Sequence, residues 1–141
     1  MRHFYIFNIN YDVVDISKIN PNELFKTFES IHYINKENIA YKINIYNNIT
    51  IKFNKEALNN RIYEAFKNNL YYTKFMNTHF YNNYYSKEKS KLIINNSYIL
   101  LDTTAIKPSF FNFFKKYKNY FVCDFENKDY FFLENVAWIK K

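Results

Sequence analysis

Apolar residues recur at helical spacing in three stretches of this 141-residue chain. The first stretch, 20–32, opens with an Asn-Pro pair, which suits the cap and the first turn of a helix. The second, 55–69, places apolar residues four positions apart behind Asn54, which can cap the helix. The third, 108–117, is rich in phenylalanine and has lysines in its last turn. Each stretch predicts a helix.

Alternating or short continuous apolar runs predict strands elsewhere in the chain. These runs are 2–10, 92–94, 98–101, 120–125 and 130–133. The first run has apolar residues on both faces, which indicates a strand well inside a sheet. Short turns containing asparagine join the other four runs into two hairpins.

Two further segments complete the predicted fold. Residues 41–46 and 49–53 alternate, and Asn47-Asn48 between them can take the positive φ of a two-residue turn, so this stretch predicts a hairpin. Residues 71–90 show no clear period, and we interpret them as a helix followed by a loop. Together the elements predict an α/β chain of the mixed α+β type. We expect a single domain over residues 1–141, with a mixed sheet of about five to six strands, several hairpins and about three helices.

The composition is aromatic and basic, with 16 Phe, 15 Tyr and a net charge of +7. A positive balance ordinarily points to nucleic acid or to an anionic membrane. However, Phe, Tyr, Asn, Lys and Ile, whose usual codons consist of A and T, fill 89 positions. An AT-rich genome therefore accounts for part of the charge, which weakens this inference.

The chain lacks the signals of membrane insertion and export. No stretch approaches the about 18 apolar residues of a transmembrane helix, and the first ten residues contain no small-residue cleavage site. Cys123 is the only cysteine, so no internal disulfide can form, which fits a reducing compartment. We expect a cytoplasmic protein with no membrane partner.

Glycine is absent, and this excludes several kinds of active site. Phosphate-binding loops, dinucleotide-binding loops and nucleophile elbows all need glycine for a tight turn or a close backbone approach. The histidines His3, His32 and His79 form no ligand pair at metal-binding spacing. We therefore predict neither a metal nor a cofactor.

The remaining catalytic candidates have ordinary structural explanations. Cys123 could act as a nucleophile, but it lies in an apolar strand, where free cysteine is usually buried. Asp124, Glu126 and Asp129 could do acid–base work, but carboxylates near a turn usually face water or bind local amides. We predict that the protein has no catalytic residues and is not an enzyme.

Tyrosines and lysines interleaved in the second half of the chain support an alternative function. Single-stranded nucleic acids are bound by stacking on aromatic rings combined with positive charge. The candidates are Tyr71, Tyr72, Lys74, Tyr81, Tyr84, Tyr85, Lys87, Lys89 and Lys91. A small basic nucleic-acid-binding module is therefore the second hypothesis, although tyrosine also suits a protein–protein contact.

Segments near both ends of the chain resemble the SirA family, sporulation inhibitors of replication from low-GC Gram-positive bacteria. The resembling segments are Arg2–Phe7, Leu24–Phe28, Phe110-Phe111, Lys115-Lys116, Phe121, Asp124-Phe125, Asn127-Lys128 and Tyr130. The resemblance lies in their order and spacing and covers about half of the chain. The middle, about 47–105, does not contribute to it.

The resemblance implies a single domain without enzymatic activity that binds the N-terminal domain of the replication initiator DnaA. Such a protein is a negative regulator that hinders DnaA at the chromosomal origin, a monomer alone and a heterodimer with its partner. The implied contact surface falls on Val13, Val14, Ile16, Ser17, Asn47 and Thr50. The family has larger aromatic or amide side chains at these places, and only Asn47 keeps an amide here. Tyr11, Ile16 and Ile19 could supply the apolar centre instead.

Overall fold

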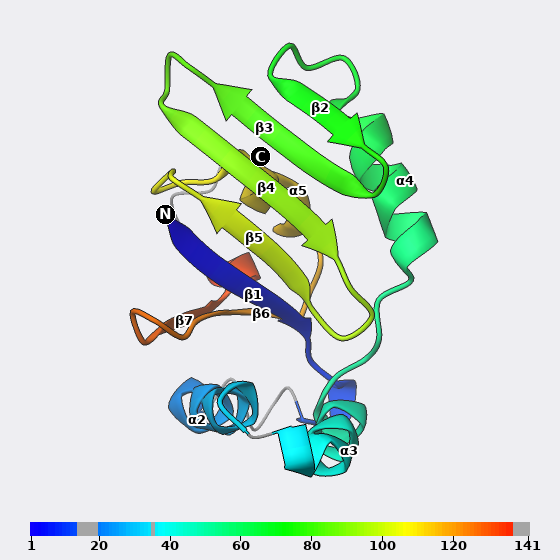
Figure 1. The fold of residues 1–141 in the computed structure, drawn as a ribbon, viewed down its shortest axis with the longest axis vertical. Coiled ribbons are helices and arrows are strands. Elements are labelled where there is room, and N and C mark those ends of the chain that lie inside the picture. Colours follow the sequence, from blue (N-terminus) through cyan, green and yellow to red (C-terminus); the bar gives the residue numbers. More distant parts are fainter. Residues whose placement is uncertain (14–19, 35, 137–141) are drawn as a thin grey trace.

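Seven strands form one antiparallel sheet in the computed structural model, which describes residues 1–13, 20–34 and 36–136. The strands are β1 (Arg2–Asn8), β2 (Tyr72–Phe75), β3 (Thr78–Asn83), β4 (Glu88–Ile94), β5 (Ile99–Thr103), β6 (Tyr120–Asp124) and β7 (Asp129–Phe132). Their order across the sheet is β2-β3-β4-β5-β1-β6-β7 (Figure 1). The N-terminal strand therefore lies inside the sheet, as its apolar residues on both faces predict.

The helices are arranged on both sides of this sheet. They are α2 (Pro21–His32), α3 (Ile39–Ile49), α4 (Lys55–Phe66) and α5 (Ser109–Phe114), with short 3-10 turns η1 (Lys36–Asn38) and η2 (Leu133–Asn135). Figure 1 shows α5 behind the central strands, and α2 and α3 at the end of the molecule near β6 and β7. The predicted single domain of mixed α+β class is confirmed. Its sheet has seven strands where five to six were expected, and it is antiparallel throughout rather than mixed.

The first hydrophobic cluster joins one sheet face to α4 and α5. Phe4 and Ile6 of β1 are fully buried there, together with Leu92 of β4. Leu58 and Ile62, four positions apart on α4, supply the covering face of that helix. Asn54 caps α4 as predicted, because its Oδ1 accepts a hydrogen bond from the Ala57 amide at 3.1 Å.

The second cluster lies on the opposite face and covers only part of the sheet. Phe7 of β1 and Phe121 of β6 pack there against Leu24, Phe25 and Phe28 of α2. The rings of Phe7 and Phe28 stack with centroids 4.0 Å apart. The cluster contains no residue of β2, β3 or β4.

Residues 41–53 are not the predicted hairpin, because most of them form α3. The residues of α3 that are at least half-buried are Lys42, Ile45, Tyr46 and Ile49, which follow helical spacing. The alternation of isoleucine and tyrosine from Tyr41 onward predicts a strand, but Tyr41 and Ile43 stay exposed in the helix. Packing of one helical face against the second cluster therefore outweighs the strand preference of isoleucine.

Residues 71–90 are likewise not a helix and a loop, since they contain β2, β3 and the start of β4. Their period is visible once the strands are known, because Tyr72, His79 and Tyr81 are all buried on one face. The turn between β2 and β3 contains Met76 with φ of 53°. Methionine gives no sequence signal for a left-handed turn position, so the hairpin was not predicted.

Candidate protein-partner interface

The end of β1 pairs with the chain that leaves α3, and this joins two segments far apart in sequence. Ile9 and Thr50 form an antiparallel bridge. The Asn10 amide donates to the Ile49 carbonyl at 2.7 Å, and the Ile51 amide donates to the Asn8 carbonyl at 2.8 Å. The segment that follows β1 therefore begins beside the C-terminal end of α3.

Helix α3 exposes apolar side chains on its outer side. Ile39 and Ile43 are 59% and 52% exposed, and Asn47 continues the same row at four-residue spacing. We call Ile39, Ile43 and Asn47 the α3 surface. Tyr41 lies on the opposite flank of the helix, and Tyr11 is exposed next to its C-terminal end. Exposed apolar residues grouped in this way often mark a protein contact.

The predicted interface residues differ in their accessibility. Asn47 is exposed on the α3 surface, and Val13 is half-buried against the second cluster. Thr50 is buried, and its hydroxyl donates to the Tyr46 carbonyl at 2.6 Å, so it holds the end of α3 in place. Val14, Ile16, Ser17 and Ile19 lie outside the described residues.

Tyr46 anchors α3 to the body of the protein. Its ring stacks near Phe7 and Phe28, with centroid distances of 6.0 and 6.4 Å. Burial raises the pKa of the Tyr46 hydroxyl to about 12. The α3 surface is therefore presented by a helix whose inner side is packed.

Little charge accompanies the α3 surface. Lys42 is the only charged residue of α3, and its ammonium lies 6.0 Å from the centre of the Tyr46 ring. At the end of α2, burial lowers the pKa of His32, and the nearby Lys42 lowers it further. An apolar, weakly charged surface favours a partner that buries apolar side chains.

Ile39, Tyr41 and Ile43 were not among the residues that the sequence singled out. Their exposure follows from the helical form of α3, whereas the expected hairpin divides the same residues between two strand faces. The sequence feature that could have identified this surface is the four-residue spacing of Ile39, Ile43 and Asn47, which is typical of one face of a helix.

The candidate catalytic carboxylates take part in an ion-pair network. Arg2 Nε donates to Asp124 at 2.8 Å, and Arg2 Nη2 donates to Asp129 at 2.9 Å. Burial alone would raise the pKa of Asp124, but hydrogen bonds from Asn127 and Arg2 outweigh it, and the pKa is lowered. The network ties β1 to the β6–β7 hairpin.

Cys123 and His79 are both completely buried. Burial raises the pKa of the Cys123 thiol well above its ordinary value. His79 is hydrogen-bonded to the Tyr72 hydroxyl and to Asn59 Oδ1, at 2.7 Å in each case. In the described parts of the chain, no group of three or more His, Cys, Asp or Glu side chains could hold a metal ion.

The hydrogen bonds of Glu88 join strand β4 to helix α5. Glu88 is buried on β4 and accepts hydrogen bonds from the Ser109 amide at 3.0 Å and the Ser109 hydroxyl at 2.7 Å. It also accepts one from the Ser90 hydroxyl at 2.7 Å. Since Pro108 provides no side-chain cap for α5, Glu88 takes that role from a distant strand.

The fold and the α3 surface together define a small α+β domain with an exposed apolar helix, an arrangement typical of protein-binding modules. A family model described as sporulation inhibitor of replication protein SirA matches residues 2–137. The chain therefore belongs to the SirA family, and the match includes the central region that did not contribute to the resemblance. No curated protein matches the chain. Every helix within 1–13, 20–34 and 36–136 is too short or too polar to span a bilayer.

Proposed function

We propose that this protein inhibits the initiation of DNA replication by binding the N-terminal domain of the initiator DnaA. Its membership of a family of replication inhibitors supports this function. The mechanism is stoichiometric: a bound inhibitor covers part of the initiator and hinders its action at the origin. The protein acts in the cytoplasm, without catalysis, metal or cofactor.

The observation that carries the proposal is the meeting of two separate segments at the Ile9–Thr50 bridge. One segment follows β1 and includes Val13, and the other is α3 with Asn47. The contact centres on the α3 surface, where Ile39 and Ile43 provide the apolar side chains that a protein partner can bury. Thr50 acts as a positioning residue, because its hydroxyl holds the last turn of α3.

Calorimetry with the purified N-terminal domain of a cognate DnaA tests the proposal directly. We expect a saturable one-to-one complex with a dissociation constant below about 10 μM. Its affinity should change little between low and moderate salt, because the α3 surface carries little charge. Absence of heat and of co-elution at tens of micromolar of both proteins, roughly the limit of a specific contact, would sink the proposal.

A matched pair of substitutions tests the location of the contact. Ile43→Glu places a charge in the centre of the α3 surface and should weaken binding at least about tenfold. Ile106→Glu makes the same chemical change at a side chain that is 84% exposed near the end of β5, and it should leave affinity unchanged. Equal affinities of the two variants for the DnaA domain would place the contact elsewhere on the protein.

A further inference from the structure

One face of β2, β3 and β4 carries no helix among the described residues. The strands alternate, so that Tyr81, Ser90 and Leu92 are buried on the side of α4 and α5. Phe80 and Lys91 belong to the other set, which points away from those helices. Figure 1 shows this side of β3 and β4 turned toward the viewer. We call Phe75, Phe80, Asn82, Lys89 and Lys91 the open sheet face.

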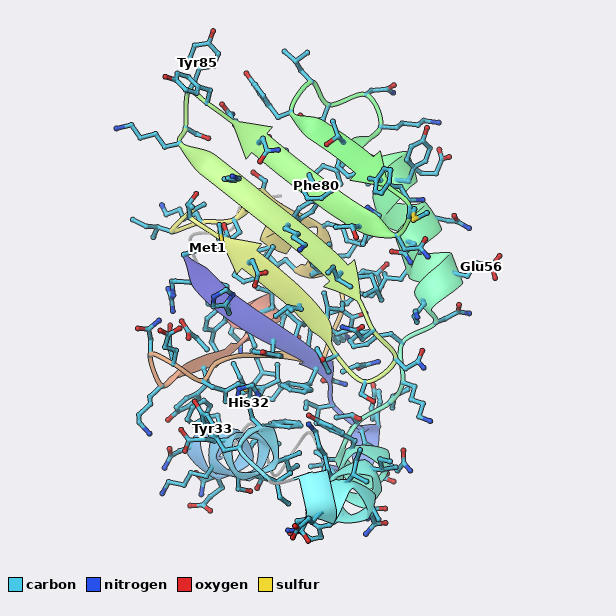
Figure 2. All side chains as sticks on the ribbon, in the orientation of Figure 1. Met1, His32, Tyr33, Glu56, Phe80 and Tyr85 are labelled. Carbon is cyan, nitrogen blue, oxygen red and sulfur yellow. The ribbon has the colours of Figure 1, made fainter. Side chains whose placement is uncertain are left out.

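Two aromatic rings lie next to each other on the open sheet face. Phe75 at the end of β2 is 70% exposed, and Phe80, labelled in Figure 2, is half-buried in the middle of β3. Phe75 pairs with Thr78, two positions before Phe80. The two phenylalanines are therefore diagonal neighbours, roughly 7–8 Å apart. Adjacent bases of an extended single strand can each stack on one of them.

Lysines border these rings on the neighbouring strand. Lys91 pairs directly with Phe80, and Lys89 pairs with Asn82. Both lysines are exposed and point to the same side, because they are two positions apart in a strand. Asp102 of β5 pairs with Lys91 and is hydrogen-bonded to His3, so one carboxylate borders the row. Two lysines against this carboxylate leave the row with net positive charge for a phosphate backbone.

The acidic residue that precedes Lys89 does not face the same way as Lys89 and Lys91. Glu88 is turned to the helix side of the sheet, where the Ser90 and Ser109 groups bind its carboxylate. Beyond the strands, a hollow of about 560 Å³ at the β3–β4 turn is lined by Asn82, Tyr84, Lys87, Glu88 and Lys89, among others. Tyr84 is 91% exposed, so aromatic and basic side chains continue past the end of the face.

We propose that the open sheet face binds single-stranded nucleic acid. Phe75 and Phe80 provide rings on which bases can stack, and Lys89 and Lys91 provide positive charge for the phosphates. Lys89 and Lys91 are among the residues that the sequence suggested, but the stacking rings are not. Tyr72 and Tyr81 are buried in the first cluster, and Lys74 lies over the Tyr63 ring at 5.4 Å, whereas Phe75 and Phe80 provide the platform. This site is separate from the α3 surface, which lies at the other end of the molecule (Figure 1).

Fluorescence anisotropy with a labelled oligothymidylate of about 15 nucleotides tests the site in the full chain. We expect saturable binding that weakens steeply with salt. Lys89→Ser with Lys91→Ser should reduce affinity at least about tenfold at low salt. The same double variant should make the slope of log K against log salt shallower by about 1.4, because two phosphate contacts are lost.

A charge-matched control separates this site from general attraction to a basic protein. Lys26→Ser with Lys55→Ser removes the same charge from α2 and α4, where both lysines are exposed, and should change affinity less than about twofold. If both double variants lose affinity equally, the attraction is nonspecific and the proposed site is wrong. Oligouridylate in a parallel titration distinguishes RNA from DNA as the preferred strand.

Phe80→Leu tests stacking separately from charge. Leucine keeps an apolar contact in the sheet but removes the ring, and we expect about tenfold weaker binding with an unchanged circular dichroism spectrum. Unchanged affinity would show that no base stacks there and would overturn the platform. The proposal also fails if the wild-type chain forms a dimer that Phe80→Leu dissociates while no oligonucleotide binds, since a second copy would then occupy the face.

Discussion

At the level of single residues, His79 is a buried imidazole that the fold keeps neutral. Burial, with a smaller effect from Lys74, lowers the pKa of His79 from its ordinary 6.5 to about 4. The neutral ring accepts a hydrogen bond from the Tyr72 hydroxyl at Nδ1 and donates from Nε2 to Asn59 Oδ1. The interior of the sheet therefore contains a polar chain that protonation would disrupt.

Because the folded state excludes a proton that the unfolded chain binds, stability should fall as the pH drops from about 6.5 toward 4. The loss from His79 is on the order of 3 kcal/mol over this window, and His32, whose pKa is also lowered, adds to it. Urea unfolding at pH 7 and pH 4.5 measures the difference. His79→Gln should be less stable at pH 7 but lose less stability on acidification. A variant as pH-sensitive as the wild type would contradict this account.

Arg2 is a second residue with an expected effect on stability, because its ion-pair partner Asp124 is buried. Replacing it by methionine leaves Asp124, which is 1% exposed, with only the hydrogen bonds from Asn127. We expect the free energy of unfolding to fall by about 2 kcal/mol, as measured by urea titration. Lys128→Met is the matched control, because the Lys128–Glu29 pair is exposed and should contribute less than about 0.5 kcal/mol. Similar losses in both variants would contradict a special role for Arg2.

At the level of elements, α5 depends on a cap from another strand. Glu88→Ala removes the acceptor for the Ser109 amide and hydroxyl and for the Ser90 hydroxyl, so we expect a loss of about 2 kcal/mol in unfolding free energy. Glu126→Ala, at an exposed position in the β6–β7 turn, should change stability by less than about 0.5 kcal/mol. Equal stability of the two variants would exclude the capping role.

Elements whose local sequence pattern agrees with their packing could be predicted, and elements that depend on distant contacts could not. α2, α4 and the two C-terminal hairpins were predicted because local spacing and turn residues agree with their packing. α3 was mispredicted because its isoleucines favour strands, whereas the packing of Tyr46 and Ile49 against the second cluster selects the helix. For the site, Val13 and Asn47 came from the resemblance, whereas Ile39 and Ile43 required the helical form of α3. The pairing of Ile9 with Thr50 is a long-range contact that no local pattern contains.

At the level of the whole molecule, the two proposed surfaces should be separable. Ile43→Glu should weaken binding of the DnaA domain and leave oligothymidylate affinity unchanged, and Lys89→Ser with Lys91→Ser should do the reverse. The reason is their separation, since α3 and β2–β4 lie at opposite ends of the sheet (Figure 1). Calorimetry and anisotropy on the same preparations measure both affinities. A variant that loses both, while remaining folded, would indicate one shared surface.

The central position of β1 also determines when the molecule can assemble during its synthesis. The partners of β1 are β5 and β6, whose residues are made about a hundred positions later. A ribosome working at roughly 5–20 residues per second needs about 5–20 s to reach β5. During that interval the first strand, apolar on both faces, leaves the exit tunnel without either neighbour. Until its second half emerges, the nascent chain therefore exposes apolar strand surface, which is the kind of surface that chaperones bind.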